Sequence, residues 1–180
     1  MMSEVVLRVL ICDDHAVVRK GIRAVLIEDG GLEVVAEAAN GQQAIAHAIR
    51  LRPDVILMDL VMPIMDGVEA THRILQEWPE ARVLVLTTFA ADDRVIPAIK
   101  AGVLGYLLKD STPDQLLQAV RQVGRGEPSL PPTIARKLMN QISHPAEPSV
   151  DGLSERELEV LQLVVEGLSN REIANRLVIS

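Results

Sequence analysis

Polar side chains that could take part in chemistry stand at four points where short apolar runs of the sequence end. Asp13 and Asp14 follow the first run, Asp59 follows "VILM", Thr87 closes "VLVL", and Lys109 follows "GYLL". In an open parallel sheet, ligands bind outside the carboxyl ends of the strands, so polar residues at these ends share one edge. The sequence therefore predicts that these five side chains cluster around one point.

The chemistry of such a cluster is that of a cation and a phosphoryl group. Three carboxylates at one sheet edge repel each other unless a hard divalent cation binds among them, and Mg²⁺ favours a few carboxylates together with a phosphate oxygen. A metal and an ammonium group can neutralise the oxygens of a phosphoryl group while a carboxylate attacks in line. In this arrangement Asp59 is the predicted nucleophile.

The elements that must position this cluster alternate between apolar runs and amphipathic stretches, a pattern that predicts successive βαβ units. Five strands are predicted near Arg8–Cys12, Leu32–Ala36, Val55–Met58, Arg82–Leu86 and Gly105–Leu108. Helices are predicted near His15–Glu28, Gln42–Leu51, Asp66–Glu77, Asp92–Ala101 and Pro113–Val123. The predicted fold class is α/β, with a five-stranded parallel doubly wound sheet over residues 1–123.

Two helix starts and one proline refine this pattern. Asp66 is predicted to cap the third helix, and Thr112 with Gln115 forms a capping box around Pro113. Pro97 falls inside the predicted fourth helix, where it removes a backbone hydrogen bond and should kink or shorten the helix.

The composition changes at "GRGEPSLPP", and proline and glycine recur to residue 152, which marks a linker over residues 124–152 that contains one short helix. Residues 153–180 then show two helix starts of the capping-box type, Ser154 with Glu157 and Ser169 with Glu172. The chain is therefore predicted to hold one α/β domain, a linker, and part of a small all-α domain.

Bulk properties exclude several functional classes. The net charge is -7, and residues 153–180 carry three Arg against five Glu, so no basic segment indicates a generic polyanion binder. The lone Cys12 excludes an intramolecular disulfide. The N-terminal apolar run is broken by Arg8 and is too short for a signal or membrane-spanning segment, so we expect a cytoplasmic protein without membrane contact.

Residues 7–123 resemble the receiver domains of two-component response regulators, which are flavodoxin-like. The resemblance rests on "LICDD", "ILMDLVMPIMDG", "VLVLTTF" and "AGVLGYLLKD", in that order. It implies that Asp59 accepts a phosphoryl group from a sensor histidine kinase. It also implies that Asp14, Asp59 and the Val61 carbonyl hold Mg²⁺, with Asp13 bound directly or through water. Lys109 would pair with the acyl phosphate, Thr87 would bind the phosphoryl group, and Tyr106 would turn inward behind it.

Residues 153–180 resemble the first part of the helix-turn-helix output domain of the NarL/FixJ, or LuxR-type, transcription regulators. The match includes the Arg156-Glu157 pair and "SNREIA". In such domains the second helix of the motif lies in the major groove, so the recognition helix is expected to follow Ser180, where the domain is incomplete. The resemblance implies a homodimer that forms on phosphorylation and binds promoter DNA, with no turnover of an outside substrate.

Two other functions remain open on the sequence alone. The chain could be a stand-alone receiver that signals through protein contacts, with the tail as a helical appendage. It could also be an aspartyl-phosphate phosphatase of the haloacid-dehalogenase kind. Those enzymes need a second acid two residues after the nucleophile, and Val61 occupies that position.

Overall fold

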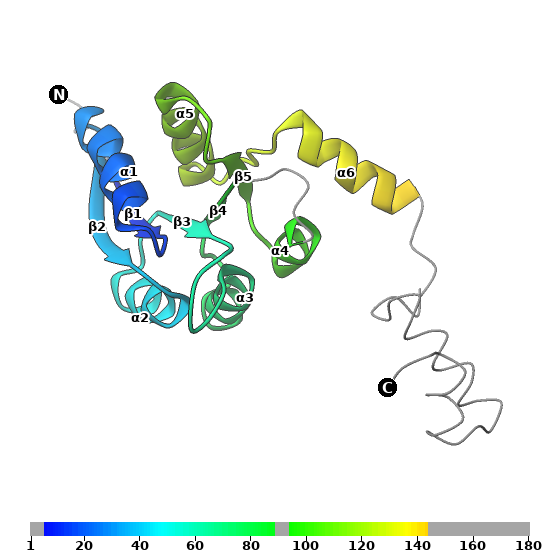
Figure 1. The fold of residues 1–180 in the computed structure, drawn as a ribbon, viewed down its shortest axis with the longest axis horizontal. Coiled ribbons are helices and arrows are strands. Elements are labelled where there is room, and N and C mark those ends of the chain that lie inside the picture. The colour runs from blue at the N-terminus through cyan, green and yellow to red at the C-terminus, as the bar shows by residue number, and fades with distance from the viewer. Residues whose placement is uncertain (1–5, 89–93, 144–180) are drawn as a thin grey trace, which may run out of the picture. The chain divides into compact units, whose positions relative to one another are not determined.

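The computed structural model describes residues 6–88 and 94–143 (Figure 1). The strands are β1 (Leu7–Cys12), β2 (Leu32–Ala38), β3 (Val55–Asp59), β4 (Val83–Thr87) and β5 (Gly105–Leu108). The helices are α1 (Ala16–Glu28), α2 (Gly41–Leu51), α3 (Gly67–Glu77), α4 (Val95–Ala101), α5 (Pro113–Gly124) and α6 (Pro132–Ser143). The predicted strands are confirmed to within two residues at each end.

The five strands form one sheet in the order β2-β1-β3-β4-β5, and all neighbouring strands are parallel. This order reverses direction between β1 and β3, and such a reversal opens a crevice at the carboxyl ends of those two strands. The predicted doubly wound α/β sheet is therefore confirmed, and β1 and β3 flank its reversal point.

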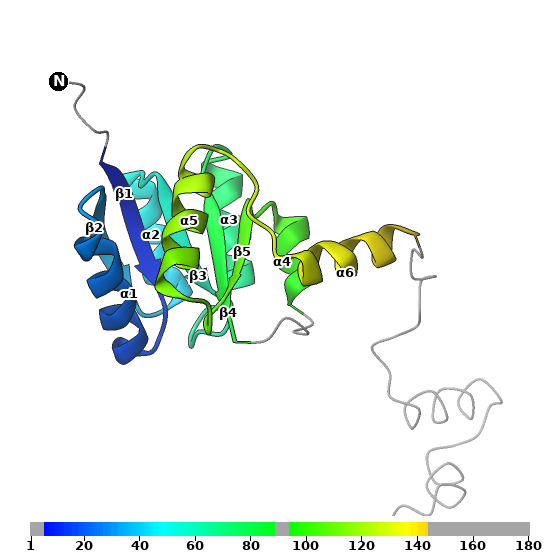
Figure 2. The same cartoon turned by 90° about the horizontal axis from the view of Figure 1, so that it is seen from above.

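Side chains alternate between the two faces of the sheet because the period of a strand is two residues. On β1, Val9 and Ile11 pack with α1 and α5, whereas Leu10 and Cys12 pack with α2 and α3. Figures 1 and 2 show α1 and α5 on one side of the sheet and α2, α3 and α4 on the other. Strands buried on both faces read as nearly continuous apolar runs, which is why they are visible in the sequence.

In the described part of the chain, α2, α3 and α5 begin with a side-chain cap. Asp66 accepts from the Glu69 amide at 2.9 Å, and Asn40 accepts from the Gln43 amide at 2.9 Å. Thr112 and Gln115 form the complete capping box with Pro113 in the first turn of α5. The predicted caps at Asp66 and Thr112 are thus confirmed.

Helix α4 differs from its prediction at the N-terminal end. It begins at Val95, so Pro97 lies in its first turn, where a backbone amide has no partner within the helix. The first turn therefore accommodates Pro97 without a broken hydrogen bond, and the helix is shorter than predicted. The predicted start at Asp92 lies outside the described residues.

The contacts within the chain divide it into two units, Met1–Met139 and Asn140–Ser180. The predicted helices of residues 153–180 lie outside the described residues. Among the residues that the structure describes, no helix is long and apolar enough to cross a membrane.

Candidate functional site

The strand register brings the predicted polar residues to one edge of the sheet. Cys12 pairs with Met58, so Asp13 and Asp59 each follow one member of this pair. Thr87 is the last residue of β4 and pairs with Leu108, and Lys109 follows directly. The Lys109 amide donates to the Thr87 carbonyl at 2.7 Å, which fixes the start of the Lys109 side chain beside β4. Asp13, Asp59 and Thr87 are buried there.

Lys109 bridges two buried carboxylates. Its Nζ lies 2.6 Å from Asp59 Oδ2, to which it donates, and 2.7 Å from Asp13 Oδ2. The Asp13 side chain is 0% exposed, that of Asp59 4% and that of Lys109 17%. A buried ion pair is tolerated only where its geometry is close and its partners are hydrogen-bonded. Asp59 Oδ2 accepts from Lys109, and Asp13 Oδ1 accepts from the His15 amide at 2.7 Å.

Burial and pairing act against each other in the pKa values of this group. Burial raises the pKa of Asp59 above its ordinary value, and the nearby Lys109 ammonium only partly offsets this shift. Burial acts to lower the pKa of Lys109, but hydrogen bonds and charge attraction to Asp13 and Asp59 outweigh it, so the pKa of Lys109 is raised. At neutral pH the fold therefore favours a charged lysine between the carboxylates.

Four side chains around this point could hold a cation. Asp13, Asp14, His15 and Asp59 each offer one ligand atom, and these atoms lie within 4.8 Å of one another. Three carboxylates against one ammonium leave a net negative charge, which a divalent cation would balance. Carboxylate oxygens are the ligands of hard cations such as Mg²⁺. The residues present therefore fit this cation.

The loop after Asp59 is held tightly against the strand. The Val61 amide donates to Asp59 Oδ1 at 3.2 Å, so both carboxylate oxygens of Asp59 have a partner. The Gly67 amide donates to the Leu60 carbonyl at 3.0 Å, and a Cβ on Gly67 would lie 2.0 Å from the Asp59 carbonyl oxygen. Only glycine allows this approach. The predicted role of the Val61 carbonyl as a metal ligand stays a prediction.

Tyr106 lies behind the site. It pairs with Val85 on β4 and is 0% exposed. Its ring belongs to a buried cluster with Leu60, which directly follows Asp59, and with Ile134 of α6. Tyr106 is thus already buried in this structure, and its predicted inward turn in response to phosphorylation stays a prediction.

The structure adds two residues to which the sequence analysis assigned no role. His15 Nδ1 lies 2.7 Å from Asp14 Oδ1, and its position directly after two aspartates was the available signal. Arg19 donates to the Asp13 carbonyl at 2.7 Å and pairs with Glu37 of β2 at 3.2 Å. The contacts of Arg19 join three elements, and no local spacing in the sequence indicates them.

Comparisons with known proteins agree with this geometry. The family described as "Response regulator receiver domain" matches residues 9–121, and the family "Bacterial regulatory proteins, luxR family" matches residues 151–180. The transcriptional regulatory protein LiaR of Bacillus subtilis is 44% identical, over 97% of this chain and 83% of LiaR. The response regulator protein VraR of Staphylococcus aureus is 45% identical, over 94% of this chain and 80% of VraR.

Solved structures give the same result. The crystal structure of the response regulator ChrA, from a heme-sensing two-component system, superimposes with a TM-score of 0.64 at 38% identity, covering 98% of this chain and 83% of ChrA. The receiver match alone spans more than half of this chain, and the luxR match follows it along the chain. The chain therefore belongs to the response regulators of two-component systems, in the branch that regulates transcription through a luxR-type DNA-binding domain.

Proposed function

We propose that Asp59 is the phosphoacceptor of this regulator and that its phosphorylation controls DNA binding. The observation that supports this most strongly is the pairing of its buried carboxylate with Lys109 at 2.6 Å, inside an acidic cluster. A carboxylate oxygen of Asp59 attacks the phosphorus of a phosphohistidine on a sensor kinase. The P–O bond forms, the P–N bond breaks, and the imidazole keeps the electron pair.

The other residues of the cluster hold the reacting groups in place. Asp13, Asp14, Asp59 and the Val61 carbonyl would bind Mg²⁺, which supplies positive charge to the phosphoryl oxygens. Lys109 already lies against Asp59 Oδ2 and supplies a second positive charge there. The positive charges of Mg²⁺ and Lys109 would stabilise the phosphoryl oxygens during transfer more than they stabilise the unmodified Asp59 carboxylate.

The switch that follows involves Thr87 and Tyr106. The Thr87 hydroxyl binds the new phosphoryl group from the end of β4, and Tyr106 fills the space behind it. Phosphorylation then promotes a homodimer in which the luxR-type domain binds promoter DNA. A local charge change that biases a two-state element is sufficient for such a response. We place this process in the cytoplasm, with the receiver at 1–123, the linker at 124–152 and the DNA-binding domain from 153.

The site supports self-phosphorylation rather than turnover of an outside substrate. Val61 occupies the place where a phosphatase of the haloacid-dehalogenase kind has its general acid, and its side chain is apolar and exposed. The luxR match at residues 151–180 favours a transcription regulator over a stand-alone receiver. The catalysis proposed for this chain is therefore limited to its own phosphorylation and dephosphorylation.

Incubation with acetyl phosphate and Mg²⁺, followed by intact mass measurement, tests the proposal. We expect the wild-type chain to gain one phosphoryl group and the Asp59→Asn variant to gain none, because an amide is not a competent nucleophile. Asp114→Asn is the matched control, because Asp114 is an exposed carboxylate in the first turn of α5. Omission of Mg²⁺ should reduce the wild-type reaction strongly. Equal phosphorylation of the wild type and Asp59→Asn would refute the assignment.

A further inference from the structure

The linker pairs with the outer edge of the receiver sheet through one isolated β-bridge. The Tyr106 amide donates to the Ser129 carbonyl at 2.7 Å, and the Ser129 amide donates to the Leu104 carbonyl at 3.2 Å. Gly105 and Ser129 thus form a parallel β-bridge on the outer side of β5. Because β5 is an edge strand, its outward backbone groups need a partner, and the linker supplies it.

The same segment continues into the receiver core. Helix α6 starts at Pro132, and Ile134 in its first turn is 0% exposed. Ile134 packs in one cluster with Tyr106 of β5 and with Val95 and Ala98 of α4. We call residues 129–134 the linker clasp, because backbone bonds at one end and one buried side chain at the other attach it to the receiver.

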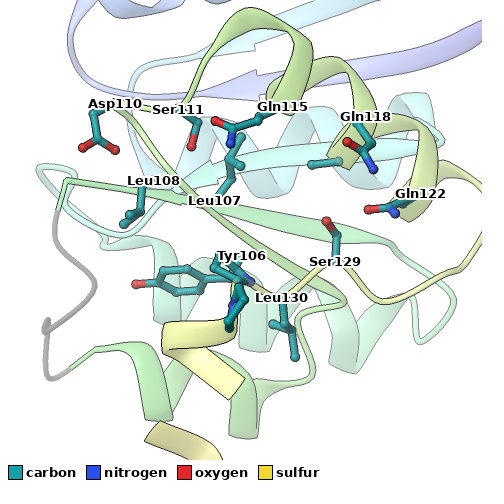
Figure 3. Close-up of a pocket in the computed structure, with 13 residues that line it drawn as sticks. Tyr106, Leu107, Leu108, Asp110, Ser111, Gln115, Gln118, Gln122, Ser129 and Leu130 are labelled. Atoms are coloured by element: carbon teal, nitrogen blue, oxygen red, sulfur yellow. The ribbon is translucent and has the colours of Figure 1, made fainter. Parts of the chain in front are cut away.

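On its other side the linker clasp borders open space. A pocket of about 490 Å³ lies between the clasp and α5, lined by Ser129 and Leu130 on one wall and by Gln118 and Gln122 on the other. Figure 3 shows these glutamines across the pocket from Ser129, and the Tyr106 ring beside the start of α6. The contacts described for the clasp are with β5, the residue before it and the Tyr106 cluster, and the pocket separates the clasp from Gln118 and Gln122 of α5.

The cluster that holds Ile134 is continuous with the candidate site. Leu60, one of its members, directly follows Asp59, and Val85, another member, lies two residues before Thr87. Val85 and Thr87 point to the same face of β4 because side chains two residues apart on a strand share a face. A change in the position of Thr87 therefore acts on the packing beneath Tyr106 and Ile134.

We propose that the linker clasp is the element through which the receiver signals: it is docked when Asp59 is unmodified and detaches when Asp59 is phosphorylated. The inference rests on the proposed function of Asp59. When Thr87 moves toward the phosphoryl group, the packing around Tyr106 changes and Ile134 loses its binding site. Closely packed cores respond to such shifts by switching between discrete arrangements. The linker that leads to the luxR-type domain is then free from residue 129 onward.

Amide hydrogen exchange on the 180-residue chain tests this directly, with Mg²⁺ and beryllofluoride as a stable phosphoryl mimic. We expect peptides that cover residues 57–68 to become protected by the mimic, and peptides that cover 127–136 to exchange at least about fivefold faster, in the range of ordinary allosteric coupling. The Tyr106 amide, which donates to the clasp, should lose protection with them.

The two proposals fail in different ways in this experiment. If residues 57–68 show no change, the chain does not bind the mimic at Asp59, and the proposed function fails together with the inference that rests on it. If residues 57–68 become protected while residues 127–136 keep their exchange rates, Asp59 binds the mimic and the linker clasp is not its output. Only the combined change supports both.

Variants of the clasp provide a second test, in which a substitution rather than the phosphoryl mimic detaches the linker clasp. Ile134→Ala should bring the exchange of residues 127–136 without beryllofluoride to the rate of the wild type with it. Coupling between two sites is reciprocal. The variant should therefore also bind beryllofluoride more tightly, by the same factor as the increase in exchange of residues 127–136. Met139→Ala is the matched control, because Met139 lies on the same helix and is 67% exposed.

Ser129→Pro perturbs the same clasp without touching the core, because proline removes the amide that donates to Leu104. If Ile134→Ala fails to fold, Ser129→Pro still tests whether the clasp is coupled to Asp59. We expect Ser129→Pro to show the same two changes. Unchanged affinity for beryllofluoride in a folded variant with a detached clasp would overturn the inference.

Discussion

Lys109 is the one lysine or arginine that pairs with both Asp13 and Asp59 in the described part of the chain, and its single positive charge is shared between them. At the scale of single residues, the site has more carboxylates than ammonium groups, so it can bind an additional cation. Two buried carboxylates share one ammonium, and Asp14, whose side chain is 30% exposed, adds a third carboxylate beside them. Burial weakens the screening of the two buried charges by water. Two predictions follow from this balance.

Replacement of Lys109 by methionine should destabilise the fold by roughly 3–5 kcal/mol, because it leaves buried carboxylates without their partner. Mg²⁺ should recover part of this loss, since a cation can take the place of the ammonium charge. Urea unfolding with and without Mg²⁺ measures both effects. Lys100→Met is the control, because Lys100 is an exposed lysine on α4. Equal unfolding free energies for the two variants would contradict the charge balance described here.

The raised pKa of Lys109 also predicts a dependence of stability on pH. Because the folded state holds the lysine proton more tightly than the unfolded state, the stabilisation is complete below pH 10.5 and is lost as the pH rises through the raised pKa. The difference in unfolding free energy between the wild type and Lys109→Met should therefore be constant near neutral pH and shrink above 10.5. A difference that grows with alkaline pH has the wrong sign for this account.

At the scale of elements, the loop between β3 and α3 decides where the Asp59 carboxylate points. Its two ends are joined by the hydrogen bond from Gly67 to Leu60, and the Asp66 cap fixes the start of α3. The backbone approach at Gly67 leaves no space for a side chain. The position of Asp59 therefore depends on a residue that contributes no functional group.

Gly67→Ala should lower both stability and phosphorylation, because its Cβ would meet the Asp59 carbonyl oxygen at 2.0 Å and force the loop away from β3. We expect a loss of at least about 3 kcal/mol, comparable to severe strain in a packed region. Gly21→Ala in α1 is the opposite case, because a Cβ there meets nothing within 4 Å. It should stabilise the chain by about 0.5–1 kcal/mol through helix propensity. Urea unfolding and acetyl phosphate labelling of both variants measure the contrast.

The sequence predicted most of these elements because their signals are local. Buried strands appear as apolar runs, and the polar residues that end these runs are Asp13, Asp59, Thr87 and Lys109. The bridge from Ser129 to β5 could not be predicted in this way. It joins an irregular stretch to a strand edge, and no periodicity records such a pairing.

At the scale of the whole molecule, the chain combines a receiver with the family signature of a luxR-type DNA-binding domain. The sequence indicated this order from two separate sets of motifs. One set belongs to the phosphoryl-accepting receiver, and the other to the helix-turn-helix domain. It did not indicate that the linker is part of the receiver core through Ile134. Ile134, Leu138 and Ile142 recur at helical spacing, which indicates an apolar helix face but not which surface covers it.

Mapping the phosphoryl group after reaction with acetyl phosphate and Mg²⁺ tests the central claim most directly. Reduction with borohydride converts an aspartyl phosphate to homoserine, which peptide mass spectrometry locates in the sequence. The account predicts a single modified residue, Asp59, because its carboxylate alone combines burial with contacts to both Lys109 and the Val61 amide. Modification at Asp13 or Asp14 instead, or no modified aspartate at all, would contradict it.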